Sequence, residues 1–127
     1  MPEVIAVNPE HLDKIWDNVE PLLKEVEERA NGTWTMKTMK ASLEEGVYHL
    51  WLVGDSVIVT TITEYGACFI VAACGTKKEL IAGLPTIEKW AKSVGLNTME
   101  FVGRKGWVKD LPDYKKHVYM VKGLNDE

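Results

Sequence analysis

The sequence predicts a mixed α/β (α+β) domain with a mostly antiparallel central sheet and helices on both faces. Two patterns lead to this prediction. Apolar residues recur at helical spacing in the first third of the chain, and three strand-length apolar runs then follow one another. The connections between these runs are too short for parallel crossovers, which need a dozen or more residues, so the strands must be antiparallel. The 127 residues suffice for one core, and we expect a single domain over 1–127.

The N-terminal part is predicted to form one short strand and three helices. Residues 4–7 are the strand, and Asn8 is the predicted cap of the first helix, with proline directly after it. Pro21 interrupts the apolar pattern and is expected to open a second helix. A third helix is predicted over 35–45, with Gly46 as its stop.

Three strands are predicted next, over residues 47–53, 56–63 and 67–74. Gly54-Asp55 between the first two is a hairpin signal, so these strands should pair directly. The third run is almost continuously apolar and shows no alternation, which indicates a strand covered on both faces.

Cys68 and Cys74 are the only two cysteines in the sequence. Their even separation places both on the same face of a regular strand, about 20 Å apart, which is too far for a disulfide. Their spacing fits no zinc motif, so no metal site is predicted. We expect reduced, largely buried thiols, which are typical of a cytosol-like compartment.

The C-terminal part begins with a long helical region that opens at Gly75-Thr76. Pro85 is expected either to kink this helix or to restart it. A further strand is predicted around 99–102, then a short helix, and a last strand over 118–121.

Composition and charge argue against nucleic-acid binding and against insertion into a membrane. Charged residues make up 27% of the chain and the net charge is -4, whereas bulk nucleic-acid binding normally needs a basic excess. The chain opens with no secretory leader, and no window reaches transmembrane length. We therefore expect a cytoplasmic protein that contacts neither nucleic acid nor membrane.

The segment 103–107 (Gly-Arg-Lys-Gly-Trp) follows an alternating run and breaks it with glycines, cations and an indole. Arg104 beside Trp107 suits recognition of a carboxylate, a phosphate or a protein surface, because a guanidinium fork and an aromatic face are favoured at such sites. The structural alternative is that Trp107 anchors the short helix on the sheet, while Arg104 caps a carbonyl or pairs with an acid.

The order of these elements resembles the GNAT (Gcn5-related N-acetyltransferase) fold over most of the chain. More narrowly, it resembles small GNAT-like proteins of tailed bacteriophages in four motifs and their spacing. These are Leu50-Trp51-Leu52-Val53; Thr60, Thr61 and Thr63; Glu88-Lys89-Trp90-Ala91-Lys92 followed by Gly95; and Gly103-Arg104-Lys105-Gly106-Trp107 with Leu111.

The resemblance implies a site for acetyl-CoA on the third long strand and the helix after it. Pantetheine would lie along Phe69, Ile70, Val71 and Ala72, and the phosphates would meet Gly75, Thr76, Lys77 and Lys78. A helix N-terminus offers unpaired amides and a partial positive charge to such phosphates. The loop departs from the family pattern of Gln/Arg-x-x-Gly-x-Gly/Ala, because it has one glycine. The structural alternative is that this loop is an ordinary turn, with a threonine that caps the helix and lysines that are solvated.

Acyl transfer in this family uses a base for the amine and often a tyrosine as acid. Glu64 and His49 are the candidate bases and Tyr114 the candidate acid. The structural alternatives are a turn residue for Glu64, a partnered sheet histidine for His49, and packing at the last hairpin for Tyr114.

Two functions of different classes follow from the resemblance. The first is a degenerate acyltransferase that serves as a binding or assembly accessory module for a phage or host protein, in the host cytoplasm or on the virion. The second is an active acetyl-CoA-dependent N-acetyltransferase that acts on a small amine or a protein amino group. A homodimer is compatible with both.

Overall fold

The computed structural model describes residues 2–30, 33–103 and 106–124. Its centre is a five-stranded sheet in the order β1-β2-β3-β4-β5, which is antiparallel except between β4 and β5. The mixed and mostly antiparallel sheet that the sequence predicts is therefore confirmed. The strands are β1 (Val4–Val7), β2 (Tyr48–Val53), β3 (Ser56–Ile62), β4 (Ala67–Cys74) and β5 (Thr98–Phe101).

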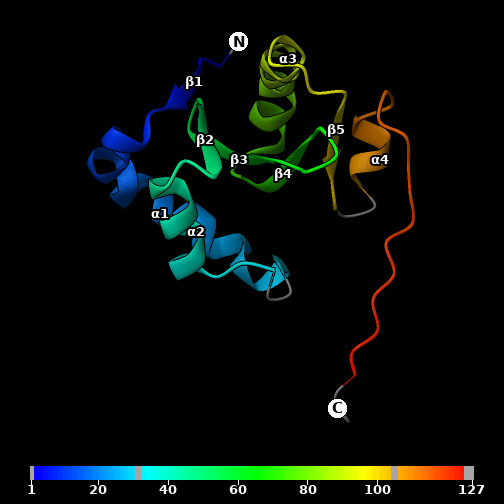
Figure 1. Cartoon of the computed structure of the whole chain (residues 1–127), viewed down its shortest axis with the longest axis horizontal. Coiled ribbons are helices and arrows are strands. Elements are labelled where there is room, and N and C mark those ends of the chain that lie inside the picture. The colour runs from blue at the N-terminus through cyan, green and yellow to red at the C-terminus, as the bar shows by residue number, and fades with distance from the viewer. Residues whose placement is uncertain (1, 31–32, 104–105, 125–127) are drawn as a thin grey trace.

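Helices cover both faces of this sheet, as predicted (Figure 1). The helix α3 packs on one face, and α1 with α2 packs on the other. Within the described residues, no helix is both long enough and apolar enough to cross a bilayer. The helical elements are the 3-10 turn η1 (Pro9–His11), α1 (Leu12–Glu27), the 3-10 turn η2 (Glu28–Ala30), α2 (Met36–Glu44), α3 (Lys77–Ser93) and α4 (Trp107–Asp110).

The cap at Asn8 is confirmed, because its side chain accepts a hydrogen bond of 3.0 Å from the Glu10 amide. The second helix that we expected at Pro21 is wrong, since Pro21 lies inside the continuous helix α1. A proline in a helix interior costs about 3 kcal/mol. The apolar stripe runs past it, and each buried side chain such as Val19 or Leu23 contributes about 1.5–3 kcal/mol, which offsets that cost.

The third predicted helix is confirmed as α2. Thr35 and Thr38 form a reciprocal capping box at its start. Gly46 follows its end with a φ of 77°, a left-handed conformation that favours glycine.

A β-bulge in β4 determines how the sheet divides its side chains between the two faces. Ala72 pairs with Val59 and Ile70 pairs with Thr60, so Val71 is an extra residue without a partner on β3. The bulge reverses the alternation of side chains within the strand. β4 therefore contributes side chains to the hydrophobic core under α1 and α2 and to the core under α3. This confirms that the strand is covered on both faces.

The bulge also corrects our prediction for the cysteines. Cys68 packs on the α3 face and Cys74 on the α1 face, because the extra residue between them inverts the pleat. Both thiols are free and buried, as expected.

Pro85 lies inside α3, which runs unbroken from Lys77 to Ser93, so the helix does not restart there. Two residues earlier, Gly83 lets α3 approach β2 closely. A Cβ atom on Gly83 would lie 2.5 Å from Cγ1 of Val53. The short helix predicted after β5 is confirmed as α4.

The last strand that we predicted over 118–121 is wrong. These residues form no regular element, and the chain from 115 to 124 runs away from the body of the protein (Figure 1). Strand propensity forms a strand only beside a second backbone, and no strand of the described chain pairs with this segment.

Candidate functional site

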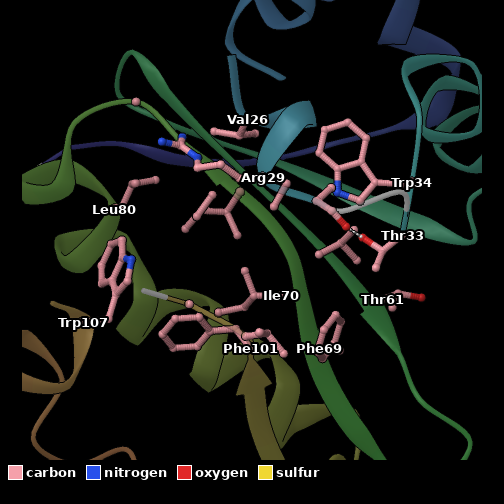
Figure 2. A pocket seen from close by; sticks show the side chains of 18 of the residues that line it. Val26, Arg29, Thr33, Trp34, Thr61, Phe69, Ile70, Leu80, Phe101 and Trp107 are labelled. Atoms are coloured by element: carbon pink, nitrogen blue, oxygen red, sulfur yellow. Dashed lines mark hydrogen bonds between the residues drawn. The ribbon is translucent and has the colours of Figure 1, made fainter. Parts of the chain in front are cut away.

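A cavity of about 1070 Å³ opens where β4 and β5 part. The two strands pair from Ala67 with Thr98 to Ile70 with Phe101, but β4 continues for four residues beyond this point to Cys74. Figure 2 shows Phe101 and Trp107 on one side of the cavity and Trp34 on the other. The cavity therefore lies between two strands that begin as neighbours and then separate.

The exposed edge of β4 forms the wall of this cavity. Beyond Ile70 no strand of the described chain pairs with β4 on the β5 side, so that edge presents free backbone N–H and C=O groups. Val71, Ala72 and Ala73 all line the cavity. The arrangement can accept an extended ligand that carries amide groups of its own.

The residues that the sequence assigns to pantetheine converge at this wall. Phe69, Ile70, Val71 and Ala72 all line the cavity. These four residues therefore belong to one wall of the cavity, while their contact with a cofactor stays a prediction.

The predicted phosphate loop lies at one end of the same cavity, which Gly75 and Lys77 line. Gly75 has a φ of 126°, and a Cβ atom on it would lie 2.1 Å from Oγ of Ser56. The Ser56 hydroxyl also accepts a 3.0 Å hydrogen bond from the Thr76 amide. Contacts within the protein therefore explain the glycine at this position. Thr76 and Lys78 are exposed.

Glu79 adds a negative charge beside this loop. Its carboxylate accepts hydrogen bonds from the Ser56 hydroxyl (2.7 Å), the Thr76 hydroxyl (3.1 Å) and the Asp55 amide (3.2 Å). The bond from Ser56, followed by that from Asp55, lowers the pKa of Glu79. An ionised Glu79 opposes the binding of a second anion at the start of α3.

Lys77 is engaged by α4. It forms an ion pair with Asp110, and its Nζ lies 5.1 Å from the centroid of the Trp107 ring. Trp107 in turn packs edge-on against Phe101, with ring centroids 5.9 Å apart. These contacts place Trp107 as an anchor of α4, in agreement with the structural alternative. Arg104 lies outside the described residues.

The three candidate catalytic residues do not line the cavity within the described chain, although the Tyr114 ring packs against Phe101, which does. Of the described residues that line it, none is Glu64, His49 or Tyr114. Glu64 is exposed in the turn between β3 and β4. Their roles in catalysis stay predictions without support from this geometry.

His49 and Tyr114 each have a defined structural environment. The His49 ring packs edge-on against Trp90, with centroids 5.5 Å apart, and burial lowers its pKa. Among the described residues its buried Nδ1 has no hydrogen-bond partner. The Tyr114 hydroxyl donates to Glu88 at 2.7 Å, and burial together with this bond raises its pKa.

Sequence reasoning missed several other polar side chains that line the cavity. Tyr48 and Thr61 are register partners on adjacent strands, and Thr61 is in turn paired with Phe69, so the three form one row across the sheet. Arg29 reaches the cavity from η2 (Figure 2). No local sequence signal marks these residues, because the register of β2, β3 and β4 brings them together.

No group of three or more His, Cys, Asp or Glu side chains in the described part of the chain is arranged to hold a metal ion.

Several solved structures share this fold, and two of the three described here are named as acetyltransferases. The aminoglycoside acetyltransferase meta-AAC0020, from an uncultured soil metagenomic sample, has a TM-score of 0.66 at 10% identity, covering 97% of this chain and 96% of that chain. A mutant of the BH1408 protein from Bacillus halodurans has a TM-score of 0.60 at 12% identity, covering 97% of this chain and 99% of that chain. The putative acetyltransferase YycN from Bacillus subtilis has a TM-score of 0.50 at 14% identity, covering 98% of this chain and 100% of that chain.

No protein-family model matches the sequence, and no curated protein matches it. The likeness to solved structures establishes a GNAT-like fold, as the sequence resemblance predicts. The likeness to proteins of tailed bacteriophages stays a prediction.

Proposed function

We propose that the cavity between β4 and β5 binds the pantetheine arm of an acyl-coenzyme A, and that the protein transfers the acyl group to an amine. One observation carries this proposal. The edge of β4 beyond Ile70 is unpaired and lines a large cavity, so an extended chain with amide groups can pair with it as a missing strand would. The acetyltransferases of the same fold support it further.

The two ends of the cavity suit different parts of this cofactor. The backbone from Val71 to Ala73 fits the pantetheine amides. The first amides of α3 and the exposed Lys78 would meet the phosphates, but Glu79 and the pairing of Lys77 with Asp110 weaken that end. We infer that the arm contributes more to affinity than the phosphates do.

The chemistry of the proposal is N-acylation of a small amine or a protein amino group. When bound, the cofactor would supply a thioester, whose acyl carbon bonds to the amine nitrogen while the thiol is released. The row of Tyr48, Thr61 and Phe69 would orient the acceptor. Neither Glu64 nor His49 lines the described cavity, so the proposal rests on positioning of the reactants and assigns no base.

Calorimetric titration tests the binding step. We expect acetyl-CoA and acetyl-pantetheine to bind with affinities within about tenfold of each other, a difference of about 1.4 kcal/mol. Ala73→Phe, which fills the cavity, should abolish binding of both, whereas Ala41→Phe on the exposed surface of α2 should not. Equal binding by both variants would contradict the proposed site.

Release of free thiol in the presence of an amine panel tests the transfer step. Ala73→Phe should lose this activity while it still unfolds cooperatively, since Ala73 is only partly buried against the core. Binding of acetyl-CoA without any thiol release would support the fold and the cavity but contradict acyl transfer.

The second candidate is a binding or assembly module that has lost cofactor chemistry. The ion pair of Lys77 with Asp110 and the position of Glu79 favour it, because both reduce the positive potential where phosphates would bind. In this case the protein captures a phage or host protein and does not bind acetyl-CoA. Co-purification from infected cells, compared with the calorimetry above, distinguishes the two functions.

A further inference from the structure

Two aromatic side chains flank a small residue in the row that crosses the cavity wall. Tyr48 on β2, Thr61 on β3 and Phe69 on β4 are successive register partners, so all three project from the same face of the sheet. All three line the cavity. Thr61 therefore forms the floor of a slot whose walls are the rings of Tyr48 and Phe69.

The spacing of strands gives this slot a defined width. Neighbouring strands lie about 4.8 Å apart, so the backbones that carry Tyr48 and Phe69 are about 9.6 Å apart. A flat ring that stacks between two others needs about 3.5–4 Å on each side. The two walls can therefore close on one planar group by leaning slightly toward it, and they leave no room for two such groups.

The walls of the slot are not engaged with other aromatic side chains. Within the described part of the chain, no ring pair contains Tyr48 or Phe69, and both side chains are half-buried. The Thr61 hydroxyl donates a 3.0 Å hydrogen bond to the Val47 carbonyl, which fixes the floor. Trp34 is buried and lines the same cavity (Figure 2). The slot thus presents two ring faces over a small, fixed side chain.

The charged side chains of the cavity lie away from the slot. Among the described residues that line the cavity, the charged ones are Glu25, Arg29 and Lys77. Lys77 is held at α4 by its ion pair. Burial raises the pKa of the Cys74 thiol, and the charges of Arg29 and Glu25 also act on it, which places both near the last residue of β4. The slot therefore offers no described acid to a ligand that carries several positive charges.

The slot adjoins the point where β4 and β5 part, because Phe69 precedes Ile70, the last residue of β4 that pairs with β5. Under the proposed function, the thioester of the cofactor would reach this point. An amine whose ring occupies the slot would need only a short linker to reach it.

We propose that the slot holds the aromatic ring of the acceptor, and that the acceptor is a primary amine joined to this ring by a short aliphatic linker. The amine nitrogen bonds to the acyl carbon while the carbon–sulfur bond breaks, and the proton that the nitrogen loses balances the one that the thiol gains. The inference rests on the proposed function for the reaction, but binding to the slot can be measured without it.

Calorimetry on the full chain with two matched amines tests the slot. Phenethylamine and cyclohexylethylamine share the amine, the linker and a six-membered ring, but only the first ring is flat. We expect phenethylamine to bind at least about fivefold more tightly, because stacking between two rings adds to what burial alone provides. Spermidine, a flexible polycation, should bind more weakly than phenethylamine. Equal affinities for the flat and the puckered ring, or tighter binding of spermidine, would overturn the proposal.

Leucine substitutions at the walls show whether these two residues select the flat ring. Phe69→Leu and Tyr48→Leu should each bring the ratio of the two affinities toward one, mainly by weakening phenethylamine. Phe69→Tyr keeps a ring face and should keep the ratio. A packing defect would weaken both amines alike, so a ratio that neither leucine variant changes would refute the slot.

A larger side chain on the floor should close the slot. Thr61→Phe should abolish binding of phenethylamine. Ile62→Phe, at the next position on the opposite face of the sheet, is the control and should keep it, because Ile62 is 48% exposed. Loss of binding in both variants, or in neither, would contradict the assignment of the floor.

Thiol release from acetyl-CoA separates this inference from the proposed function. Release with spermidine but not with phenethylamine would leave acyl transfer standing and overturn the slot. A clear preference for phenethylamine over cyclohexylethylamine in calorimetry, without any thiol release, would support the slot and contradict acyl transfer. Release that is faster with phenethylamine than with either other amine would support both.

Discussion

Lys77 and Asp110 form an ion pair that joins the first turn of α3 to α4. The same lysine lies over the Trp107 ring, so a residue expected to meet phosphates serves instead to hold α4 beside the cavity. Both side chains are partly exposed, and such pairs are worth about 0–1 kcal/mol. A ligand with a strong negative charge could therefore compete for Lys77 at small cost.

This competition leads to the first prediction. Asp110→Asn should free Lys77 and raise the affinity for coenzyme A about twofold to fivefold, which corresponds to the energy of a partly exposed ion pair. Calorimetry with coenzyme A measures the change. Asp113→Asn, which removes an exposed acid from the same segment, is the control and should leave affinity within error. A lower affinity in Asp110→Asn would show that the pair organises the phosphate site.

The elements that the sequence predicts correctly are those whose signals are local. Thr35 caps α2, and the β-branched run of β3 together with the glycine of the Gly54-Asp55 turn predicts the hairpin. The errors come from tertiary context. Pro21 is tolerated because buried side chains on both sides of it hold α1 together, and residues 118–121 lack a neighbouring backbone.

The candidate site was predictable only in part, for the same reason. The resemblance identifies β4 and the start of α3, and both line the cavity. The bulge at Val71 cannot be read from an apolar run, although it decides which side of the sheet each cysteine faces. Tyr48, Thr61 and Arg29 come from separate elements, and only the register and the helix packing bring them together.

Gly75 and Gly95 provide a matched pair for the second prediction. Both have positive φ values, 126° for Gly75 and 88° for Gly95. A Cβ atom on Gly75 would lie 2.1 Å from Oγ of Ser56, whereas a Cβ atom on Gly95 would have no described atom within 4 Å. Gly95→Ala should cost about 1 kcal/mol of unfolding free energy through backbone strain alone. Gly75→Ala should cost at least about 2 kcal/mol more, because Ser56 must move and its bonds to Glu79 and Thr76 weaken. Urea unfolding measures both, and equal costs would show that Ser56 moves freely.

The third prediction concerns the two thiols. Burial raises the pKa of Cys74 to about 12 and also raises that of Cys68, so neither is a thiolate at neutral pH. Thiol reagents should therefore label the native protein much more slowly than the urea-unfolded protein, at both positions. The Cys68→Ala and Cys74→Ala variants assign the two rates. Rapid labelling of either thiol in the native state would mean that its side of the sheet opens to solvent.

His49 gives the protein a predicted pH dependence of stability. Burial lowers its pKa below the ordinary value of 6.5, so between the folded pKa and 6.5 the unfolded chain binds more protons than the folded one. The contribution of His49 to the free energy of unfolding is therefore fully present above pH 6.5. It is lost as the pH falls through the pKa of His49 in the folded protein. Desolvation of the half-buried ring, which packs edge-on against Trp90, explains why its neutral form is preferred.

The last prediction follows from this loss of stability at low pH. The unfolding free energy of the wild type should fall as the pH decreases below 6.5, and His49→Phe should remove this part of the slope, in urea titrations over about pH 5 to 8. Phenylalanine keeps an aromatic ring against Trp90 and deletes the buried Nδ1, which has no partner among the described residues, so the variant should be at least as stable as the wild type near neutral pH. His117→Gln, on the exposed C-terminal segment, is the control and should keep the wild-type slope. If His49→Phe keeps the full slope, another group is responsible, and if it is strongly destabilised at neutral pH, the His49 ring makes a polar contact that holds β2 in place.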